Sequence, residues 1–230
     1  SNEGIELEVK WNAIRNEKLN WNISFNIARN WNRLEKSENK RDFLTEDNTT
    51  NLNIIGKPLN GLYVLKTGGI YNDDKEVPRM FINGKDTPLA GNGNTQHYRA
   101  GDRVVYDVNG DGVVNSDDRV YAGAPAPVAQ GGIVTTLEWK GFDLNVLFNF
   151  VISRHILNAA RGASVGTIIG LTPDDSVTPV YVDLNNVSFW QKPGDKTDFP
   201  MNRLEGGLGS FNSYTTANVE DVSYLKLKTF

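Results

Sequence analysis

Apolar and polar residues alternate with a period of two in four stretches of the chain. In the first stretch, charged residues separate the apolar residues Ile5, Leu7, Val9 and Trp11. The second is the clearest, with apolar residues at the odd positions of 19–27 and Asn or Ser at the even positions. The third covers 133–139, and the fourth covers 142–152. A period of two predicts β-strands, because a helix would place apolar residues at spacings of three and four.

The four stretches form two pairs, each joined by a short polar link. The link covers about 12–18 in the first pair and is Lys140-Gly141 in the second. Short links between alternating stretches predict antiparallel hairpins, here over 1–33 and 129–153. A last alternating stretch at 223–230 predicts the start of a further strand.

The segments that follow the hairpins are long. They cover residues 34–128 and 154–222. Loops of this length are uncommon in compact domains and usually have a function. Short turns at one end of the strands and long loops at the other are typical of outer-membrane barrels, with turns in the periplasm and loops outside the cell.

Two all-β architectures explain the alternation. In a soluble β-sandwich, the apolar faces pack against a second sheet and the Asn-rich faces meet water. In a transmembrane β-barrel, the apolar faces meet lipid, and about ten residues per strand at a 45° tilt rise about 23 Å, close to the apolar band of such barrels. An interfacial girdle would explain the aromatic residues beside the short links, which are Trp11, Trp21, Trp139 and Phe142.

Composition excludes several classes of function. The chain has 24 Lys and Arg against 28 Asp and Glu, so charge gives no reason to expect nucleic acid. It has no Cys, which excludes disulfides, thiolate nucleophiles and Cys-based metal sites.

His97 and His155 stand apart, and no catalytic constellation is recognisable, so we expect no enzyme. The first residues lack the features of a signal peptide, so we expect a mature sequence or part of a longer one.

Residues 107–118 resemble a twelve-residue calcium loop. Positions 1, 3 and 5 carry side-chain oxygens, position 6 is Gly, and position 7 offers its carbonyl. The expected ligands are Asp107, Asn109, Asp111, Val113 and Asp118. An Asp at position 12, in place of the Glu of sensor EF-hands, fits weak binding at extracellular calcium levels. No amphipathic helix follows, so we expect a structural ion; the alternative is an Asx- and Gly-rich turn without an ion.

Several short motifs occur together with a characteristic order and spacing. They are Gly56-Lys57-Pro58, Gly69-Ile70-Tyr71, Tyr106–Val114, Asp117-Asp118-Arg119, Gly123–Pro127, Glu138–Leu144, Phe189–Gly194, Phe199-Pro200 and Asp221–Lys228. In this combination, which extends over most of the chain, the sequence resembles the SusC/RagA family of TonB-linked outer-membrane proteins of Bacteroidetes.

The resemblance implies an all-β fold that is part of a 22-stranded transmembrane β-barrel. Hairpins 1–33 and 129–153 and the strand from 223 to 230 become barrel wall in contact with membrane lipid, and 34–128 and 154–222 become extracellular loops. The implied function is uptake of glycans or peptides across the outer membrane, together with a SusD-like lipoprotein and with TonB, which acts through a plug region outside these residues. The alternative is a secreted calcium-stapled binding module, either dockerin-like or a glycan-binding β-sandwich.

Overall fold

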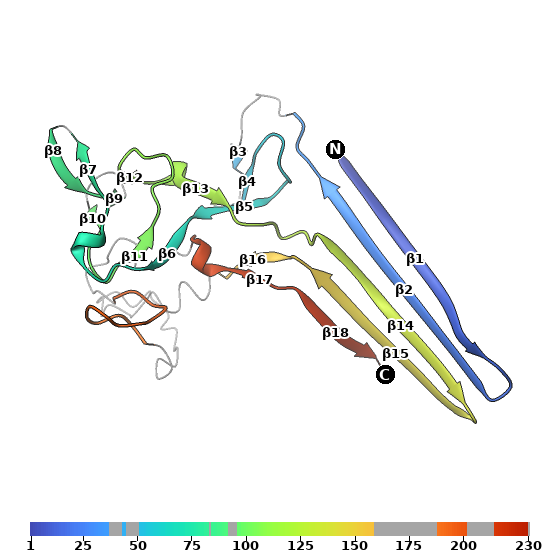
Figure 1. The fold of residues 1–230 in the computed structure, drawn as a ribbon. Coiled ribbons are helices and arrows are strands. Elements are labelled where there is room, and N and C mark those ends of the chain that lie inside the picture. Colours follow the sequence, from blue (N-terminus) through green and yellow to red (C-terminus); the bar gives the residue numbers. More distant parts are fainter. Residues whose placement is uncertain are drawn as a thin grey trace, which may run out of the picture. The chain divides into compact units, whose positions relative to one another are not determined.

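A computed structural model describes residues 1–36, 43–44, 51–82, 84–91, 96–158, 188–201 and 214–229 (Figure 1). The chain divides into two compact units. The strand unit comprises residues 1–62, 122–156 and 220–230, and the loop unit comprises residues 63–121 and 157–219. Among the described residues, no helix has both the length and the apolar character needed to cross a membrane.

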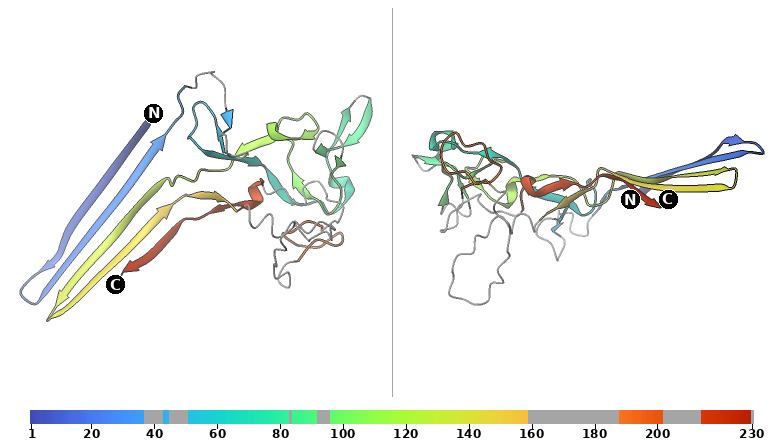
Figure 2. Two further views of the ribbon diagram at one scale, coloured as in Figure 1. Left: turned by 180° about the vertical axis from the view of Figure 1, so that it is seen from behind. Right: turned by 90° about the horizontal axis from the view of Figure 1, so that it is seen from below.

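The strand unit contains a five-stranded antiparallel sheet with the order β1-β2-β14-β15-β18 (Figure 2). The strands are β1 (Asn2–Arg15), β2 (Leu19–Asn32), β14 (Ala129–Trp139), β15 (Phe142–Ile152) and β18 (Tyr224–Thr229). The predicted antiparallel hairpins are therefore present. Strand β1 continues into the predicted link as far as Arg15, with a register shift between Asn12 and Ile14, so the turn itself is shorter than expected.

Both hairpin turns have residues suited to tight turns. In the first, the side-chain Oδ1 of Asn16 accepts hydrogen bonds from the backbone N–H groups of Lys18 and Leu19, at 2.9 and 2.8 Å. In the second, Lys140 and Gly141 both have positive φ, at 48° and 85°. Positive φ at both central residues is the geometry of the two-residue turn that matches the twist of a hairpin.

The strand register collects the apolar side chains on one face of this sheet. One row that crosses all five strands consists of Val9, Phe25, Ile133, Phe148 and Leu227. The neighbouring row on the opposite face consists of Glu8, Asn26, Gly132, Asn149 and Lys226. Because side chains alternate along each strand, one sheet has an apolar face and a polar face.

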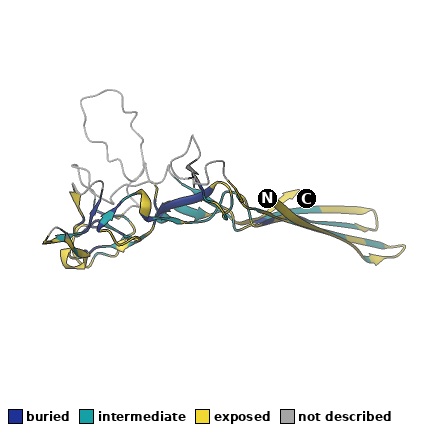
Figure 3. Ribbon diagram, turned by 90° about the horizontal axis from the view of Figure 1, so that it is seen from above, coloured by how far each residue is buried: buried dark blue, intermediate teal, exposed yellow. Residues whose placement is uncertain are grey.

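The apolar face is not covered by a second sheet in the described part of the chain. Ile5 is 62% exposed, Leu7 is 53% exposed and Leu225 is 67% exposed. Figure 3 shows mainly exposed and intermediate residues along these strands. A β-sandwich would bury these side chains, so the structure does not support that alternative.

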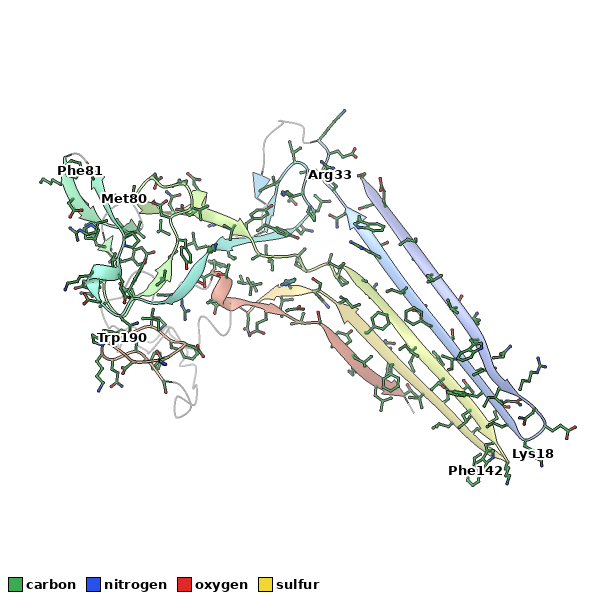
Figure 4. All side chains as sticks on the ribbon, in the orientation of Figure 1. Lys18, Arg33, Met80, Phe81, Phe142 and Trp190 are labelled. Carbon is green, nitrogen blue, oxygen red and sulfur yellow. The ribbon has the colours of Figure 1, made fainter. Side chains whose placement is uncertain are left out.

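Aromatic residues gather near the two turns, which lie at the same end of the sheet, where Lys18 and Phe142 are found (Figure 4). Trp139 is paired with Phe142 on β15, and the Nζ atom of Lys140 lies 5.3 Å from the centroid of the Trp139 ring. Trp21 donates a hydrogen bond from Nε1 to Oγ1 of Thr135 at 2.8 Å. Amphipathic rings at this position are typical of the interfacial girdle of outer-membrane barrels.

The remaining elements are short. They are β3 (Phe43–Leu44), β4 (Asn51–Asn53), β5 (Gly61–Leu65), β6 (Thr67–Ile70), β7 (Arg79–Ile82), β8 (Lys85–Pro88), β9 (Ala90–Gly91), β10 (Gln96–His97), β11 (Arg103–Val105), β12 (Val113–Val114), β13 (Arg119–Tyr121), β16 (His155–Leu157) and β17 (Val219–Asp221), with the 3₁₀ helices η1 (Asp74–Glu76), η2 (Ser116–Asp118) and η4 (Thr216–Asn218). All of them fall in the segments predicted as long loops. The described parts of these segments are therefore folded, although parts of both segments lie outside the described residues.

The loop unit has a small hydrophobic core of its own. Its buried members are Leu65, Tyr71, Val77, Leu89, Tyr98, Val105 and Val114. They come from strands and connections between 65 and 114, so one continuous stretch of chain supplies this core. The core fixes the position of the predicted calcium loop, because Val114 belongs to both.

Candidate functional site

The predicted calcium loop lies between β11 and β13 in the loop unit. Its second half contains β12, which pairs in parallel with β9 through Val113 and Ala90 and through Val114 and Gly91. The N–H of Ala90 donates to the carbonyl of Gly112 at 3.2 Å. The middle of the loop is thus held by a strand contact, and its two ends depend on side chains of the loop itself.

Three of the predicted ligands accept hydrogen bonds from backbone N–H groups of the loop. Asp107 accepts from the N–H of Gly110 at 2.7 Å through Oδ1 and from the N–H of Gly112 at 2.8 Å through Oδ2. Asn109 accepts from the N–H of Asp111 at 3.0 Å and donates from Nδ2 to Oδ2 of Asp111 at 3.1 Å. These are Asx turns, which order a loop with or without an ion.

Asp118 has a different environment from the other acids of the loop. It is fully buried, and Oδ1 accepts from the N–H groups of Val108 at 2.7 Å and Asn109 at 3.3 Å. Oδ2 accepts from the N–H of Asn115 at 2.8 Å, and the Asn115 side chain caps the same 3₁₀ helix in return. The carboxylate of Asp118 therefore closes the loop by binding backbone amides, a structural role that the sequence-based interpretation did not include.

The residues present fit a cation site only in part. Asp107, Asn109 and Asp111 lie within one hydrogen-bond network and carry the hard oxygen atoms that calcium prefers. Within the described ranges, however, no three His, Cys, Asp or Glu side chains come close enough together to hold a metal ion. A calcium ion here would depend on Asn109, the Val113 carbonyl and water for the rest of its coordination.

A second acid, Asp102, is buried in the same unit without having been singled out from the sequence. It is 1% exposed, and its Oδ2 accepts from the N–H of Arg99 at 3.0 Å. Burial raises the pKa of Asp102 to about 6, although the N–H and the charge of Arg99 oppose the rise. Burial also raises the pKa of Tyr71 to about 12, with smaller contributions from Tyr106 and Asp102. No sequence motif marks Asp102.

Trp190, labelled in Figure 4, anchors the segment 188–201 against Asn72 and Gly101 of the loop unit. It is 4% exposed, and its Nε1 donates to Oδ1 of Asn72 at 3.2 Å. Gly101 lies under the indole with φ of +85°, and a Cβ atom there would be 2.6 Å from Cε3 of Trp190. The N–H of Met201 donates to the carbonyl of Gly101 at 2.7 Å, which completes the anchor.

Two grooves adjoin this anchored segment. Each has a volume of about 450 Å³, within the range of small-ligand sites. Asp198 and Phe199 line both grooves. The sequence drew attention to Phe199-Pro200 only as part of a family motif, and Asp198 carries no signal of its own because a single exposed acid is common on any surface.

Comparison with known proteins gives relatives that match nearly the whole chain. It is 24% identical over 234 residues to TonB-dependent receptor P3 of Formosa agariphila, an alignment that covers 99% of this chain and 21% of that protein. It is also 24% identical over 245 residues to TonB-dependent receptor P39 of the same organism, covering 94% of this chain and 22% of that protein. The chain thus spans about a fifth of the length of these relatives. No family model matches it.

Solved structures give the same result for the fold. A chain of the RagAB peptide transporter superimposes with a TM-score of 0.67 at 22% identity, covering 99% of this chain and 21% of that one. The RagAB peptide importer in the "closed-closed" state superimposes with a TM-score of 0.63. The predicted resemblance is confirmed: the chain is similar to TonB-dependent receptors over nearly its whole length, and its fold is that of part of a RagAB chain.

Proposed function

We propose that this chain supplies wall strands and surface segments of a TonB-dependent importer with a 22-stranded barrel. The importer takes up glycans or peptides and has no catalytic activity. It works with a SusD-like lipoprotein at the cell surface, and TonB acts through a plug region outside these residues. The solved structures with the same fold are named as the RagAB peptide transporter and the RagAB peptide importer, which supports a role in import.

The observation that carries this proposal is the two-faced sheet. The apolar row through Phe25 and Phe148 is open on its outer side, and the row through Asn26 and Asn149 is polar. The apolar face is suited to contact with lipid, and the polar face is suited to contact with a water-filled lumen. Strands β2 and β14 each pair with a neighbouring strand on both sides, in keeping with the backbone pairing that the hydrocarbon region of a membrane requires.

We further propose that the loop at 107–118 holds a structural calcium ion. Asp107, Asn109 and Asp111 would hold it through their side chains and Val113 through its carbonyl, while Asp118 keeps the backbone of the loop in place. When bound, calcium supplies a charge that neutralises the carboxylates of Asp107, which is half-buried, and Asp111, which is exposed. The ion has no role in transport chemistry on this interpretation.

An uptake experiment tests the importer. Depletion of a mixture of oligosaccharides and peptides from the medium is measured by mass spectrometry for the native strain, a strain without this protein, a strain without TonB and a strain without the lipoprotein. We expect one class of compound to remain in the medium in all three deletion strains. A small sugar that diffuses through porins serves as the control. Unchanged uptake in the strain without this protein would refute the proposal.

A further inference from the structure

The apolar face of β2 ends with Arg29 and Trp31, at the end of the strand away from the turn. Figure 4 shows Arg33 at this end of the hairpin and Lys18 in the turn at the other end. Arg29 and Trp31 occupy odd positions, as Phe25 does, so their side chains project from the apolar face. Trp31 is 44% exposed, and Arg29 is exposed as well. The apolar face of this strand thus ends with a cation and an aromatic ring.

The length of strand between Trp21 and Trp31 matches the apolar band of an outer membrane. Trp31 lies ten positions after Trp21, on the same face of β2. Ten residues at about 3.3 Å each, tilted by about 45°, rise about 23 Å, against an apolar band of about 25 Å in outer-membrane barrels. Aromatic girdles mark both edges of this band, and short turns face the periplasm, which places Trp31 at the extracellular edge. Arg29 therefore lies close to the lipid headgroups of the outer leaflet.

The side chain of Arg29 extends toward Trp31. Its Cζ atom lies 4.7 Å from the centroid of the Trp31 ring. An arginine at the edge of the hydrocarbon region adopts such a conformation because its apolar stem stays among the lipid chains while its charge reaches the interface. Stacking uses the flat face of the guanidinium group and leaves the N–H groups in its plane directed outward. Two parallel N–H groups of a guanidinium can bind one phosphate, so Trp31 orients a group suited to phosphate.

The charge at this end of the hairpin also favours an anion. A cavity of about 390 Å³ adjoins Trp31 and is lined by Ser1, Glu3, Trp31, Arg33 and Glu35. The backbone carbonyl of Lys57 accepts from the N–H of Leu34 at 3.0 Å, which brings Lys57 to the same end. The cations are Arg29, Arg33, Lys36 and Lys57, and the acids are Glu3 and Glu35. In the described part of the chain, neither acid forms an ion pair with Arg29. A surplus of Lys and Arg beside a membrane attracts anionic lipid.

We propose that Arg29, stacked on Trp31, binds the phosphate group of an anionic lipid in the outer leaflet of the membrane. This inference rests on the proposed function, because it requires the odd positions of β2 to face lipid. It also goes beyond import, because the lipid is a neighbour of the barrel wall and not the cargo. Arg33 and Lys57 add positive charge around the site, and Arg29 makes the direct contact.

Native mass spectrometry of the purified full-length protein in detergent tests the site. The probes are lipid A, which carries phosphate, and lipid A from which the phosphate groups have been removed. We expect Arg29→Gln to bind one molecule of lipid A fewer than the native protein does. Trp31→Leu keeps the arginine but removes the ring that orients it, and should lose the same molecule. The native protein and both variants should bind the dephosphorylated lipid in equal number.

Arg15→Gln is the matched control. Arg15 is an exposed arginine in β1 of the same hairpin, where it pairs with Asn20 near the turn. This variant should bind as many molecules of lipid A as the native protein does. Heat-modifiable mobility on gels checks that each variant is assembled before its bound lipid is counted.

Three results would overturn the proposal. The first is an equal number of lipid A molecules on Arg29→Gln and on the native protein. The second is an equal loss of the dephosphorylated lipid, which would mean that phosphate is not recognised. The third is the same loss in Arg15→Gln, which would assign the effect to overall charge. The count of bound lipid does not require transport, so failure of this site is distinguishable from failure of the importer, which the uptake experiment reports separately.

Discussion

Phe25 and Phe150 stack on each other across β14, although they belong to strands that are not neighbours. Their ring centroids are 6.0 Å apart and their planes differ by 10°. The position between them on β14 is Gly131, which pairs with Ile27 on one side and Phe150 on the other. Because Gly131 has no side chain, the Phe150 ring lies over the strand and fills the gap in the apolar face.

Gly131→Ala should impair assembly of the sheet. A Cβ atom at Gly131 would be 2.1 Å from the backbone oxygen of Asn26 and 2.7 Å from Cζ of Phe150, so β2 and β14 would have to separate locally. Overpacking of this kind costs about 1–3 kcal/mol. The assembled fraction of the full-length protein is measured by its heat-modifiable mobility on gels. The control is Gly132→Ala, where the closest atom is 3.3 Å away, and equal loss in both variants would contradict the prediction.

Phe148→Arg should block insertion of the full-length protein into the outer membrane. Phe148 lies in the central apolar row, and an arginine on the lipid face near the midplane of a barrel costs about 2–4 kcal/mol. Asn149→Arg places the same charge one residue further along, on the polar face, and should insert normally. Cell fractionation measures both variants. Normal insertion of Phe148→Arg would show that this face does not meet lipid.

Asp118→Ala should loosen the loop at 107–118. The substitution leaves the N–H groups of Val108, Asn109 and Asn115 without their acceptor, and each buried unsatisfied group costs about 1–3 kcal/mol. We expect faster hydrogen exchange at Val108 and Asn115. The exposed neighbour Asp117, changed to Ala, is the matched control. Unchanged exchange in Asp118→Ala would contradict the capping role.

Calcium removal should loosen the same loop to a smaller extent. We expect EGTA to increase hydrogen exchange at Gly110 and Gly112, and millimolar calcium to restore protection. Asp111→Ala should abolish this response, because it removes one of the two carboxylates proposed to bind the ion through their side chains. If calcium has no effect on the native protein at any concentration up to the extracellular range, the loop is an Asx- and Gly-rich turn stabilised by its own side chains.

The stability of the turn around Asp102 should fall as the pH rises. The carboxyl has a pKa of about 6 when folded, chiefly because of burial, against its usual 3.8. Between these two pKa values the folded state holds the proton more tightly than the unfolded state does. The stability that the proton gives is therefore fully present below about pH 4 and is lost as the pH rises through 6. Hydrogen exchange at Arg99, corrected for intrinsic rates, measures this change. Asp102→Asn should remove the pH dependence, and its persistence there would assign it to another group.

The wall strands were predictable because each alternates over many residues. In β2, five apolar residues at odd positions, from Leu19 to Ile27, leave one interpretation of the local structure. The pairing of β2 with β14 was not predictable in the same way. It joins residues more than 100 positions apart, such as Phe25 and Ile133, and neither the alternation nor the turns encode that contact.

The loop unit was harder to predict, for physical reasons. Its strands have two to five residues, too few to show a period, and a core residue such as Tyr98 lies between the polar neighbours His97 and Arg99. The positions of the calcium-type residues were visible in the sequence, but the burial of Asp118 was not. The Asn at 115, three residues before Asp118, is a capping signal that would have indicated its role.

The rows of paired residues that cross the five strands also set how this chain can change in length. Loss of one residue within β2 would move every later side chain of that strand to the opposite face, so that Asn26 would take the place of Phe25 beside Ile133. Any variation in the number of residues must therefore avoid the strands or occur in steps of two. The connections outside the sheet have no such restriction on their number of residues. Insertions and deletions there can create new surfaces while the strands stay the same.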